Sequence, residues 1–372
     1  MLGGGQLGRF FVIAAHELGY RVVVLDPDPQ SPAGRIADRH LVAAYDDADA
    51  LNRMAESCAA VTTEFENVPA DSLVYLSKFV PVRPGAEAVR ISQNRSAEKG
   101  FLRQHGFPHA PFADIRAEAD IDSANAGLFP GILKVARFGY DGKGQAVVNS
   151  REEALAAFTH FKGEHCVLEQ KLALDYEVSV VLARDESGAV RCFPTGENSH
   201  MRGILDVSIV PSRASGCVRS DAEDIAARIA GQLGYIGTMG VEFFVSRGQL
   251  YVNEMAPRPH NSGHYTLDAC DVSQFELQVR ALTGLPLVPP RHHSPAIMLN
   301  LLGDLWFDAA GRPITPAWSE VLALPGTHLH LYGKLDARKG RKMGHLNITG
   351  TDVEGVRATA LQAASLLGIP AF

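Results

Sequence analysis

Two apolar runs joined by a turn, each carrying one carboxylate, constrain this chain more than any other feature. Residues 241–244 and 250–254 have the composition of strands, and Gly248 supplies the turn between them. An antiparallel hairpin of these runs places Glu242 and Glu254 side by side. Two like charges so close need a counter-ion, and Mg²⁺ is typically held by one or two carboxylates together with substrate oxygens. We therefore predict a hairpin that binds Mg²⁺ through Glu242 and Glu254.

Polar side chains lie on both sides of the second acid in the sequence. Asn253 would add a neutral oxygen ligand, and Arg258, His260, Asn261 and Ser262 would hold an anion beside the metal. For either Glu alone, a solvated polar loop is the better interpretation. The run as a whole favours a binding site.

Composition excludes several classes of protein. The 372 residues are too many for one ordinary core and indicate two or three domains. The net charge of -7 argues against a nucleic-acid partner, although the short basic tract 338–342 could bind one phosphate. No apolar run reaches spanning length and no signal-peptide pattern is present, so we expect a cytoplasmic protein without a membrane partner. Five widely spaced cysteines indicate neither a disulfide framework nor a zinc site.

The first third alternates strands and helices, as in an open parallel sheet whose strand ends meet a ligand. Gly3, Gly5 and Gly8 match GxGxxG at the start of a helix, so their N–H groups could receive a phosphate. Asp26 stands near the spacing at which an acid meets a ribose. An NAD-dependent oxidoreductase is therefore an alternative, although a tight strand-to-helix turn explains the same glycines.

The strand expected before these glycines is missing. Only Met1 and Leu2 precede them. A central strand of a parallel sheet cannot be absent without leaving backbone groups unpaired. We expect either a truncated chain or a misplaced start.

A lone lysine and a glycine-rich loop predict a phosphate site in the middle of the chain. Lys134 lies in the apolar strand 130–135, where a charge is seldom buried without an anionic partner, although an exposed strand face would also accommodate it. Residues 137–145 form a flap whose N–H groups can close over phosphates. The loop is not a Walker A motif, and a plain hairpin turn is its alternative. A linker is expected at residues 285–295, which contain four prolines.

The order of these features resembles the ATP-grasp superfamily of carboxylate-amine ligases, over essentially the whole chain. Five runs look like those of the 5-(carboxyamino)imidazole ribonucleotide synthases of purine biosynthesis: residues 3–9, 63–69, 139–145, 197–200 and 253–264. The resemblance implies an α/β ATP-grasp fold in three parts. These are an N-terminal doubly wound α/β domain (1–92), an ATP-grasp domain (93–290) with a mobile lid at about 112–172, and a small C-terminal β-rich domain (291–372).

The implied reaction joins ATP, bicarbonate and 5-aminoimidazole ribonucleotide into the N-carboxylated ribonucleotide, through carboxyphosphate. A homodimer is also implied. Other ATP-grasp ligases, such as biotin carboxylase and formate-dependent glycinamide ribonucleotide transformylase, share the scaffold but are not expected to carry the same flap and 257–262 run. A nucleotide-binding regulatory module without turnover is a further alternative, against which the intact acidic hairpin argues.

The resemblance also implies a role for each site residue. The expected ATP contacts are Arg95 and Lys134 at the phosphates, the flap Gly139, Tyr140, Asp141, Gly142, Lys143, Gly144 and Gln145 over them, the backbone of Glu169, Gln170, Lys171 and Leu172 at the adenine, Glu177 at the ribose, and His200, Asn253 and Glu254 nearby. Arg258, His260, Asn261 and Ser262 would hold bicarbonate or carboxyphosphate. The expected contacts of the aminoimidazole ribonucleotide are Gly5, Gln6, Leu7, Glu64, Tyr140, Asp141, Lys334 and Arg341.

Overall fold

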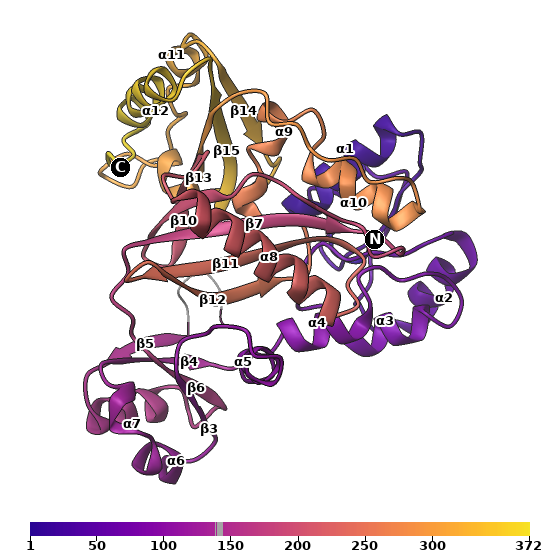
Figure 1. Cartoon of the computed structure of the whole chain (residues 1–372). Coiled ribbons are helices and arrows are strands. Elements are labelled where there is room, and N and C mark those ends of the chain that lie inside the picture. The colour runs from indigo at the N-terminus through magenta and orange to yellow at the C-terminus, as the bar shows by residue number, and fades with distance from the viewer. Residues whose placement is uncertain (138, 140–143) are drawn as a thin grey trace.

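The structure is a computed structural model that describes residues 1–137, 139 and 144–372. The predicted roles of Tyr140, Asp141, Gly142 and Lys143 therefore lie outside the described residues. The elements fall into an N-terminal parallel sheet, a small antiparallel sheet and a large central sheet (Figure 1).

The N-terminal sheet is parallel and is covered by helices. Its strands β1 and β2 pair in parallel, Leu2 bridges Leu25 on one side and Thr63 on the other, and Val61 bridges Val82. The elements of this region are α1 (Gln6–Glu17), β1 (Val23–Leu25), β2 (Arg39–Leu41), α2 (Ala48–Ser57), α3 (Ala70–Leu76) and α4 (Ala86–Ser92). The predicted doubly wound α/β arrangement is present.

A four-stranded antiparallel sheet forms the lower left part of Figure 1, with strand order β3-β6-β4-β5. We call this sheet and its helices the lid. Its elements are β3 (Phe112–Ile115), α6 (Glu118–Ser123), the 3-10 turn η1 (Ala126–Leu128), β4 (Gly131–Val135), β5 (Gln145–Val148), α7 (Arg151–His160) and β6 (Cys166–Gln170). The helix α5 (Arg95–Gln104) precedes the lid and contacts both β6 and β12.

The central sheet has nine strands and carries both the acidic hairpin and the C-terminal strands. Its path is β12-β11-β7-β9-β10-β13-β15-β14, with β8 paired to β7. The strands are β7 (Tyr176–Arg184), β8 (Val190–Cys192), β9 (Gly196–Met201), β10 (Ile204–Val210), β11 (Gly237–Ser246), β12 (Gln249–Ala256), β13 (Ala296–Leu302), β14 (Thr327–Leu331) and β15 (Lys342–Thr349). The C-terminal strands thus continue the same sheet.

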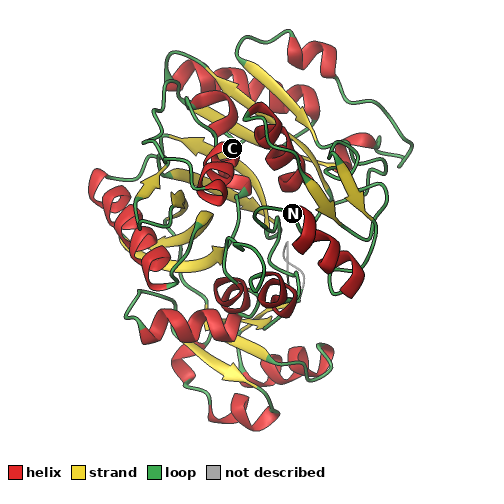
Figure 2. Cartoon of the chain, turned by 90° about the vertical axis from the view of Figure 1, so that its right-hand side faces the viewer, coloured by secondary structure: helices red, strands yellow, loops and turns green. Residues whose placement is uncertain are grey.

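Helices cover the central sheet, as Figure 2 shows. They are α8 (Gly216–Gln232), α9 (Thr266–Ala269), α10 (Gln274–Thr283), α11 (Trp318–Leu322) and α12 (Val353–Leu367), with the short 3-10 turns η2 (Asn261–Gly263) and η3 (Gly303–Trp306). Ser273 caps the start of α10, and Gly284 ends it in the left-handed conformation.

Alternation along β11 separates the core from the site. Val241, Phe243 and Val245 are buried under α8 in one apolar cluster. Glu242 and Phe244 point to the other face because successive strand residues alternate. The strand pattern therefore places the acid away from the core.

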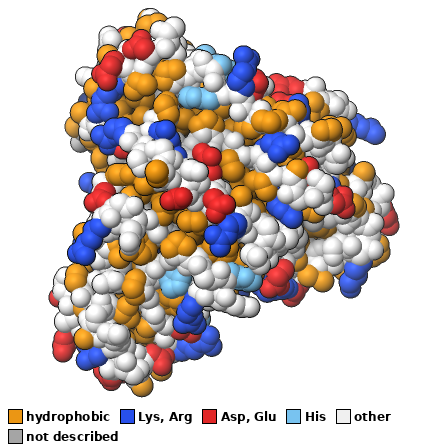
Figure 3. Space-filling view, viewed as in Figure 1, with side chains coloured by type: hydrophobic (Ala, Val, Ile, Leu, Met, Phe, Trp, Pro, Cys, Tyr) orange, Lys and Arg blue, Asp and Glu red, His pale blue; other side chains and the backbone are white. Residues whose placement is uncertain are grey.

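The distribution of charged side chains on the surface is consistent with the modest net charge. Acidic and basic side chains are interspersed on the face drawn in Figure 3. Among the described residues, no helix is long and apolar enough to cross a membrane.

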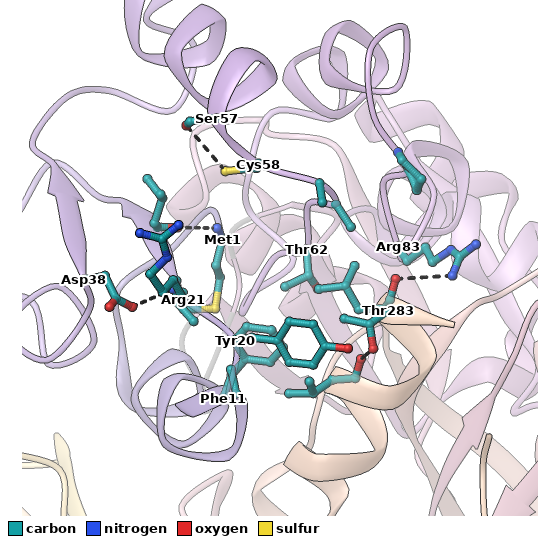
Figure 4. A pocket seen from close by; sticks show the side chains of 18 of the residues that line it. Met1, Phe11, Tyr20, Arg21, Asp38, Ser57, Cys58, Thr62, Arg83 and Thr283 are labelled. Atoms are coloured by element: carbon teal, nitrogen blue, oxygen red, sulfur yellow. Dashed lines mark hydrogen bonds between the residues drawn. The ribbon is translucent and has the colours of Figure 1, made fainter. Parts of the chain in front are cut away.

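The place of the strand expected before the glycine turn is held by two residues. Leu2 donates to Thr62 O at 2.9 Å, and Leu25 donates to Met1 O at 2.9 Å, so both neighbouring strands are paired there. A cavity of about 830 Å³ lies beside Met1, between the same two neighbouring segments (Figure 4). Residues of both neighbours line it, including Val23 of β1 and Thr62. It is a gap between neighbouring segments of the parallel sheet and lies away from the acidic hairpin.

An apolar N-terminal extension of five or six residues should raise the melting temperature. The added strand would pair with both neighbours and bury side chains in the cavity beside Met1, at about 1.5–3 kcal/mol for each large aliphatic residue. Each kcal/mol gained should raise the melting temperature by roughly 2–4 °C, measured by differential scanning fluorimetry.

The control is an extension of the same length made of Gly and Ser. Both extensions convert the Met1 amine to an amide, so their comparison isolates the apolar side chains. Equal melting temperatures for the two would contradict strand insertion.

Candidate active site

A cavity of about 360 Å³ lies between the lid and the central sheet. Ile132 and Lys134 of the lid line one side, and Glu242, Asn253 and Glu254 of the acidic hairpin line the other. The site thus joins two sheets that share no strand.

Glu242 and Glu254 lie directly opposite each other in the register of β11 and β12, as the hairpin pattern predicts. The register shifts by one residue immediately after this pair, a bulge that ends regular pairing beside the site. The Asn253 amide is 3.3 Å from Glu242 Oε2. Burial raises the pKa of Glu242, and Glu254 adds to the rise while His200 opposes it.

Arg95 stands beside the second acid because a helix begins there. The side chain of Asn94 accepts hydrogen bonds from Ser96 N and Ala97 N and so caps α5. Arg95 Nη1 is 3.5 Å from Glu254 Oε2, with the guanidinium mostly buried. Arg95 thus brings a fixed positive charge to the acids.

Lys134 belongs to a buried cluster of charges. Its Nζ is 3.1 Å from Glu169 Oε1, and Lys99 Nζ is 3.3 Å from Glu169 Oε2. Burial lowers the pKa of Lys134, partly opposed by Glu169. Burial would raise the pKa of Glu169, but the two ammonium groups lower it to about 2. The lysine predicted to be paired with an anion is paired with Glu169, and Lys99 is a member that the sequence interpretation missed.

Arg258 is held by an acid from the N-terminal region. Its Nε donates to Glu66 Oε2 at 2.5 Å. Burial would lower the pKa of Arg258, but Glu66 raises it above its usual value. Sequence interpretation assigned no role to Glu66, although this residue lies in the 63–69 run.

His200 lies between the expected ribose ligand and the acidic hairpin. Its Nδ1 is 3.0 Å from Glu177 Oε2, and its Nε2 is 3.9 Å from Glu242 Oε1. Burial would lower the pKa of His200, but Glu177 and Glu242 raise it to about 9. His200 is therefore a cation at neutral pH and offsets part of the acidic charge.

Of the four residues expected to hold bicarbonate, the three that follow Arg258 differ in position. His260 and Asn261 line the cavity, whereas Ser262 is 1% exposed and does not. Both amide atoms of Asn261 are buried without a hydrogen-bond partner among the described residues, and such atoms are costly unless a ligand pairs with them. Burial lowers the pKa of His260 well below its usual value. Direct contact with an anion is thus open to Asn261 and closed to the Ser262 side chain.

Apolar residues form part of the wall where a base could stack. They come from both sheets and from the segment between them: Ile132, Leu174, Leu205 and Phe244. No sequence signal separated them from core residues, except that Phe244 follows Glu242 by two positions on the same face.

The ends of the predicted flap reach the cavity. Gly139 and Gln145 line it. Gly144 has φ 68°, and a Cβ there would lie 2.4 Å from the side chain of Val135, so a larger residue would be strained.

The segment expected at the adenine leaves β6 at the rim of the lid. The N–H groups of Gln170 and Lys171 donate to Pro111 O and Pro130 O. Leu172 follows them, two residues before the cavity-lining Leu174. None of residues 169–172 lines the cavity itself, so their contact with the adenine stays a prediction.

The glycine turn is occupied by a carboxylate. Glu64 accepts from the N–H groups of Gly5 (2.6 Å) and Gly8 (2.9 Å), and Asp26 accepts from Gly4 (2.7 Å). Burial raises the pKa of Glu64, partly opposed by these amides. The hypothesis that Gly5 and Gly8 N–H groups receive a phosphate is therefore wrong for this structure. The arrangement also argues against an oxidoreductase, since the carboxylate would repel a pyrophosphate.

The remaining residues of the turn divide between site and core. Gln6 begins α1 and is half-buried. The Leu7 side chain is buried in the N-terminal core. Only its backbone remains available.

Lys334 and Arg341 do not line the 360 Å³ cavity, whereas their neighbour Lys342 does. Lys334 donates to Lys342 O at 2.6 Å and Arg341 to Asp336 O at 2.8 Å. Arg35 of the N-terminal region donates to Gly333 O at 3.1 Å. The loop that carries the two cations thus lies against the domain of the glycine turn.

The oxygen donors fit Mg²⁺. Among the described residues, no group of three or more His, Cys, Asp or Glu could hold a metal ion. Glu242 and Glu254 lie opposite each other and supply two carboxylates to a cavity that Arg95, Lys134, Arg258 and Lys342 also line. This is the incomplete protein set that Mg²⁺ uses when substrate phosphates complete its coordination.

Comparison with known proteins identifies the parts of the chain. Residues 1–93 match the ribonucleotide synthetase preATP-grasp domain, residues 100–275 the ATP-grasp domain, and residues 296–359 the phosphoribosylaminoimidazole carboxylase C-terminal domain. The chain is an ATP-grasp ligase in fold and in class.

The particular family follows from full-length relatives. An N5-carboxyaminoimidazole ribonucleotide synthase of Brucella melitensis is 43% identical, over 93% of this chain and 94% of the relative. The crystal structure of the Thermus thermophilus synthetase has a TM-score of 0.90 at 37% identity and covers 100% of this chain and 99% of that one. The Aspergillus clavatus enzyme, a complex with ADP and 5-aminoimidazole ribonucleotide, has a TM-score of 0.89 at 29% identity and covers 99% and 97%. The chain belongs to the N5-carboxyaminoimidazole ribonucleotide synthase family.

Family membership confirms the resemblance, the fold class and the enzyme class predicted from the sequence. It decides against the formate-dependent transformylase and the oxidoreductase. The roles of individual residues remain predictions.

Replacing Glu98 with Gln should flatten the pH dependence of stability. Glu98 is buried and accepts from Met255 N at 2.6 Å. Burial raises its pKa to about 8, with Lys99 opposing the rise. The folded state therefore binds more protons between pH 4.5 and 8, and the free energy of unfolding falls as pH rises through this window, by at most about 1.4 kcal/mol per pH unit.

The measurement is the melting temperature from pH 5 to pH 8. Gln keeps the oxygen that accepts from Met255 but does not titrate, so Glu98→Gln should be more stable than the parent at pH 8. The exposed Glu87→Gln serves as the matched control and should keep the parent slope. Equal slopes for parent and Glu98→Gln would contradict the buried-acid assignment.

Proposed function

We propose that this chain catalyses the ATP-dependent carboxylation of 5-aminoimidazole ribonucleotide by bicarbonate in de novo purine biosynthesis. The observation that carries the proposal is one cavity in which Lys134 and Arg95 face the opposed Glu242 and Glu254. Phosphate-binding cations and metal-binding acids are thus present together.

The chemistry needs no protein nucleophile. A bicarbonate oxygen attacks the γ-phosphorus of ATP, ADP leaves, and carboxyphosphate forms. The amino nitrogen of the ribonucleotide then takes the carboxyl group, releasing phosphate and a proton. Positioning, charge neutralisation and exclusion of water from the labile acyl phosphate supply the catalysis.

The ATP assignments follow the cavity walls. Arg95 and Lys134 meet the phosphates, the flap from Gly139 to Gln145 covers them, and the backbone of residues 169–172 meets the adenine against the apolar wall. Glu177 meets the ribose, with His200 beside it.

Glu242 and Glu254, with the amide oxygen of Asn253, would hold Mg²⁺. When bound, the ion would neutralise charge on the phosphate oxygens. Arg258, His260 and Asn261 would hold bicarbonate, supported by their place in the cavity wall and by the unpartnered Asn261 amide. The ribonucleotide would lie near Gly5, Gln6, Glu64, Tyr140, Asp141, Lys334 and Arg341.

We further propose a cytoplasmic homodimer with working units 1–92, 93–290 and 291–372, and no nucleic-acid partner. The family resemblance supports the dimer, and the interspersed surface charge supports the last point (Figure 3). Sedimentation velocity tests the dimer.

Glu254→Gln should reduce turnover by orders of magnitude while leaving the fold intact, because an amide is a poor replacement for a carboxylate ligand of Mg²⁺. The measurement is phosphate release with ATP, bicarbonate and aminoimidazole ribonucleotide, together with the melting temperature. Glu320→Gln changes an exposed acid in the same way and should behave like the parent. Near-normal turnover in Glu254→Gln would remove the metal assignment.

The double variant Lys334→Ala, Arg341→Ala should raise the half-saturating concentration of aminoimidazole ribonucleotide. Loss of a charge-assisted hydrogen bond to its 5-phosphate costs roughly 1.5–3 kcal/mol, which corresponds to about one to two orders of magnitude. The half-saturation for ATP should barely change, since its phosphates lie with Lys134.

The neighbouring Arg338→Ala, Lys339→Ala variant removes two exposed cations of the same tract and is the matched control. Phosphate release is measured with and without the ribonucleotide. If the first double variant matches this control, or glycinamide ribonucleotide with formate stimulates the parent instead, the proposed substrate site is wrong.

A further inference from the structure

The acid that contacts Arg258 comes from the N-terminal region of the chain. Glu66 belongs to the loop 63–69 and stands 192 positions before Arg258. Both residues line the 360 Å³ cavity, where the side chains of Glu66 and Arg258 are 23% and 16% exposed. Sequence interpretation assigned an anion to Arg258 and no role to Glu66. A carboxylate beside a site for an anion repels that anion, so its place in the cavity wall needs a reason.

Two of the three nitrogens of the Arg258 guanidinium group have partners in the protein. Nε donates to Glu66 Oε2 at 2.5 Å, and Nη1 donates to Pro259 O at 3.2 Å. Among the described residues, Nη2 has no hydrogen-bond partner. Because the guanidinium group is planar and rigid, contacts at Nε and Nη1 fix the direction of Nη2. Nη2 is thus the donor that remains for an anion, and the contact with Glu66 sets its orientation.

Glu66 is a carboxylate at neutral pH. Burial would raise its pKa, but Arg258 lowers it below the usual value. A group with a low pKa is a weak base, and proton transfer is most efficient when the pKa lies near the operating pH. Orientation of Arg258 therefore suits Glu66 better than acceptance of the proton that the carboxylation releases.

The loop that carries Glu66 is itself held in place. Gln93 is 8% exposed, and its Nε2 donates to Glu66 O at 2.5 Å and also to Val68 O. Its Oε1 accepts from Arg137 Nη2 at 3.3 Å, at the start of the flap. Glu64, two residues before Glu66, is bound to the glycine turn. The N-terminal region thus fixes the backbone from which the Glu66 carboxylate reaches Arg258.

We propose that Glu66 is a positioning residue that orients the guanidinium group of Arg258 so that Nη2 faces bicarbonate and the carboxyphosphate formed from it. The inference rests on the proposed function, in which Arg258 holds this anion. Glu66 itself touches neither substrate. The anion site then depends on two parts of the chain, since the ATP-grasp domain supplies the arginine and the domain that would bind the ribonucleotide supplies its orientation.

The positioning role is tested by two variants at Glu66. Gln keeps the length of the side chain and an oxygen that accepts from Arg258 Nε, whereas Ala removes the acceptor. Glu66→Ala should raise the half-saturating bicarbonate concentration by about 10- to 100-fold and leave that of ATP unchanged. Glu66→Gln should restore most of the loss. The measurement is phosphate release at varied bicarbonate, and a lowered half-saturation in Glu66→Ala would overturn the proposal.

A double-mutant cycle separates action through Arg258 from direct contact with the substrate. Arg258→Lys keeps a positive charge but lacks the Nε–H donor and the rigid fork. If Glu66 acts by orienting the guanidinium group, Glu66→Ala should cause no further rise in half-saturating bicarbonate in the Arg258→Lys background. Rises that multiply would show that Glu66 contacts the substrate itself, which contradicts the proposal.

The contact can also be observed in the whole protein without substrate. Arginine Nε–H groups give signals in ¹H–¹⁵N correlation spectra, and the signal of Arg258 is assigned by its loss in Arg258→Lys. We expect slow exchange of this hydrogen with solvent in the parent and in Glu66→Gln, and fast exchange in Glu66→Ala. Equal exchange in the parent and in Glu66→Ala would mean that Glu66 does not hold Arg258.

The matched control is Glu186→Ala. Glu186 pairs with Arg83 at 2.6 Å, so this variant also removes an ion pair between the N-terminal region and the body, but away from the acidic hairpin. It should keep the parent half-saturation for bicarbonate. An equal rise in Glu186→Ala and Glu66→Ala would assign the effect to the attachment of the two parts and sink the inference. A parent that does not use aminoimidazole ribonucleotide and bicarbonate overturns the proposed function and this inference with it, whereas an active parent with multiplying variants overturns this inference alone.

Discussion

Two carboxylates held opposite each other on one strand pair are the constraint to which the rest of the site responds. Unit charges about 4 Å apart repel by roughly 4 kcal/mol at an effective dielectric constant near 20. The protein places Arg95 beside Glu254 and His200, whose pKa is raised to about 9, beside Glu242. These groups reduce the repulsion without removing the need for a cation. The acids are thus ready for a metal that arrives with its nucleotide.

A second buried group of charges connects the lid to this hairpin. Lys99 of α5 is fully buried, contacts Glu169 of the lid strand β6 at 3.3 Å, and donates to the carbonyls of Val252 and Asn253 in β12. One ammonium group therefore connects the lid to the strand that carries Glu254. Breaking a buried pair on one side leaves an uncompensated charge, so this contact also specifies where the lid sits.

The sequence predicts what is local and misses what the fold brings together. The opposed acids depend on a turn and an alternating pattern within 13 residues, so the hairpin can be predicted from the sequence. Glu66 and Arg258 are in contact although 192 positions separate them in the sequence, and 83 positions separate Ser179 from its partner Ser262. No rule of residue spacing predicts contacts at such sequence separations. The apolar wall of the cavity has the composition of core strands. The family resemblance supplied the substrate and the three-part fold, which periodicity alone could not.

The continuity of the central sheet has a consequence for how the protein unfolds. Because β13 pairs with β10 and is followed in the sheet by β15 and β14, the C-terminal strands share hydrogen bonds with the strands of the ATP-grasp body. The linker at residues 285–295 therefore does not separate two units that unfold independently. Removal of everything after residue 290 would leave the backbone groups at the edge of β10 unpaired and open to aggregation. The lid shares no strand with that sheet. Body and C-terminal region should melt as one unit, and the lid is the part that can open while they remain folded.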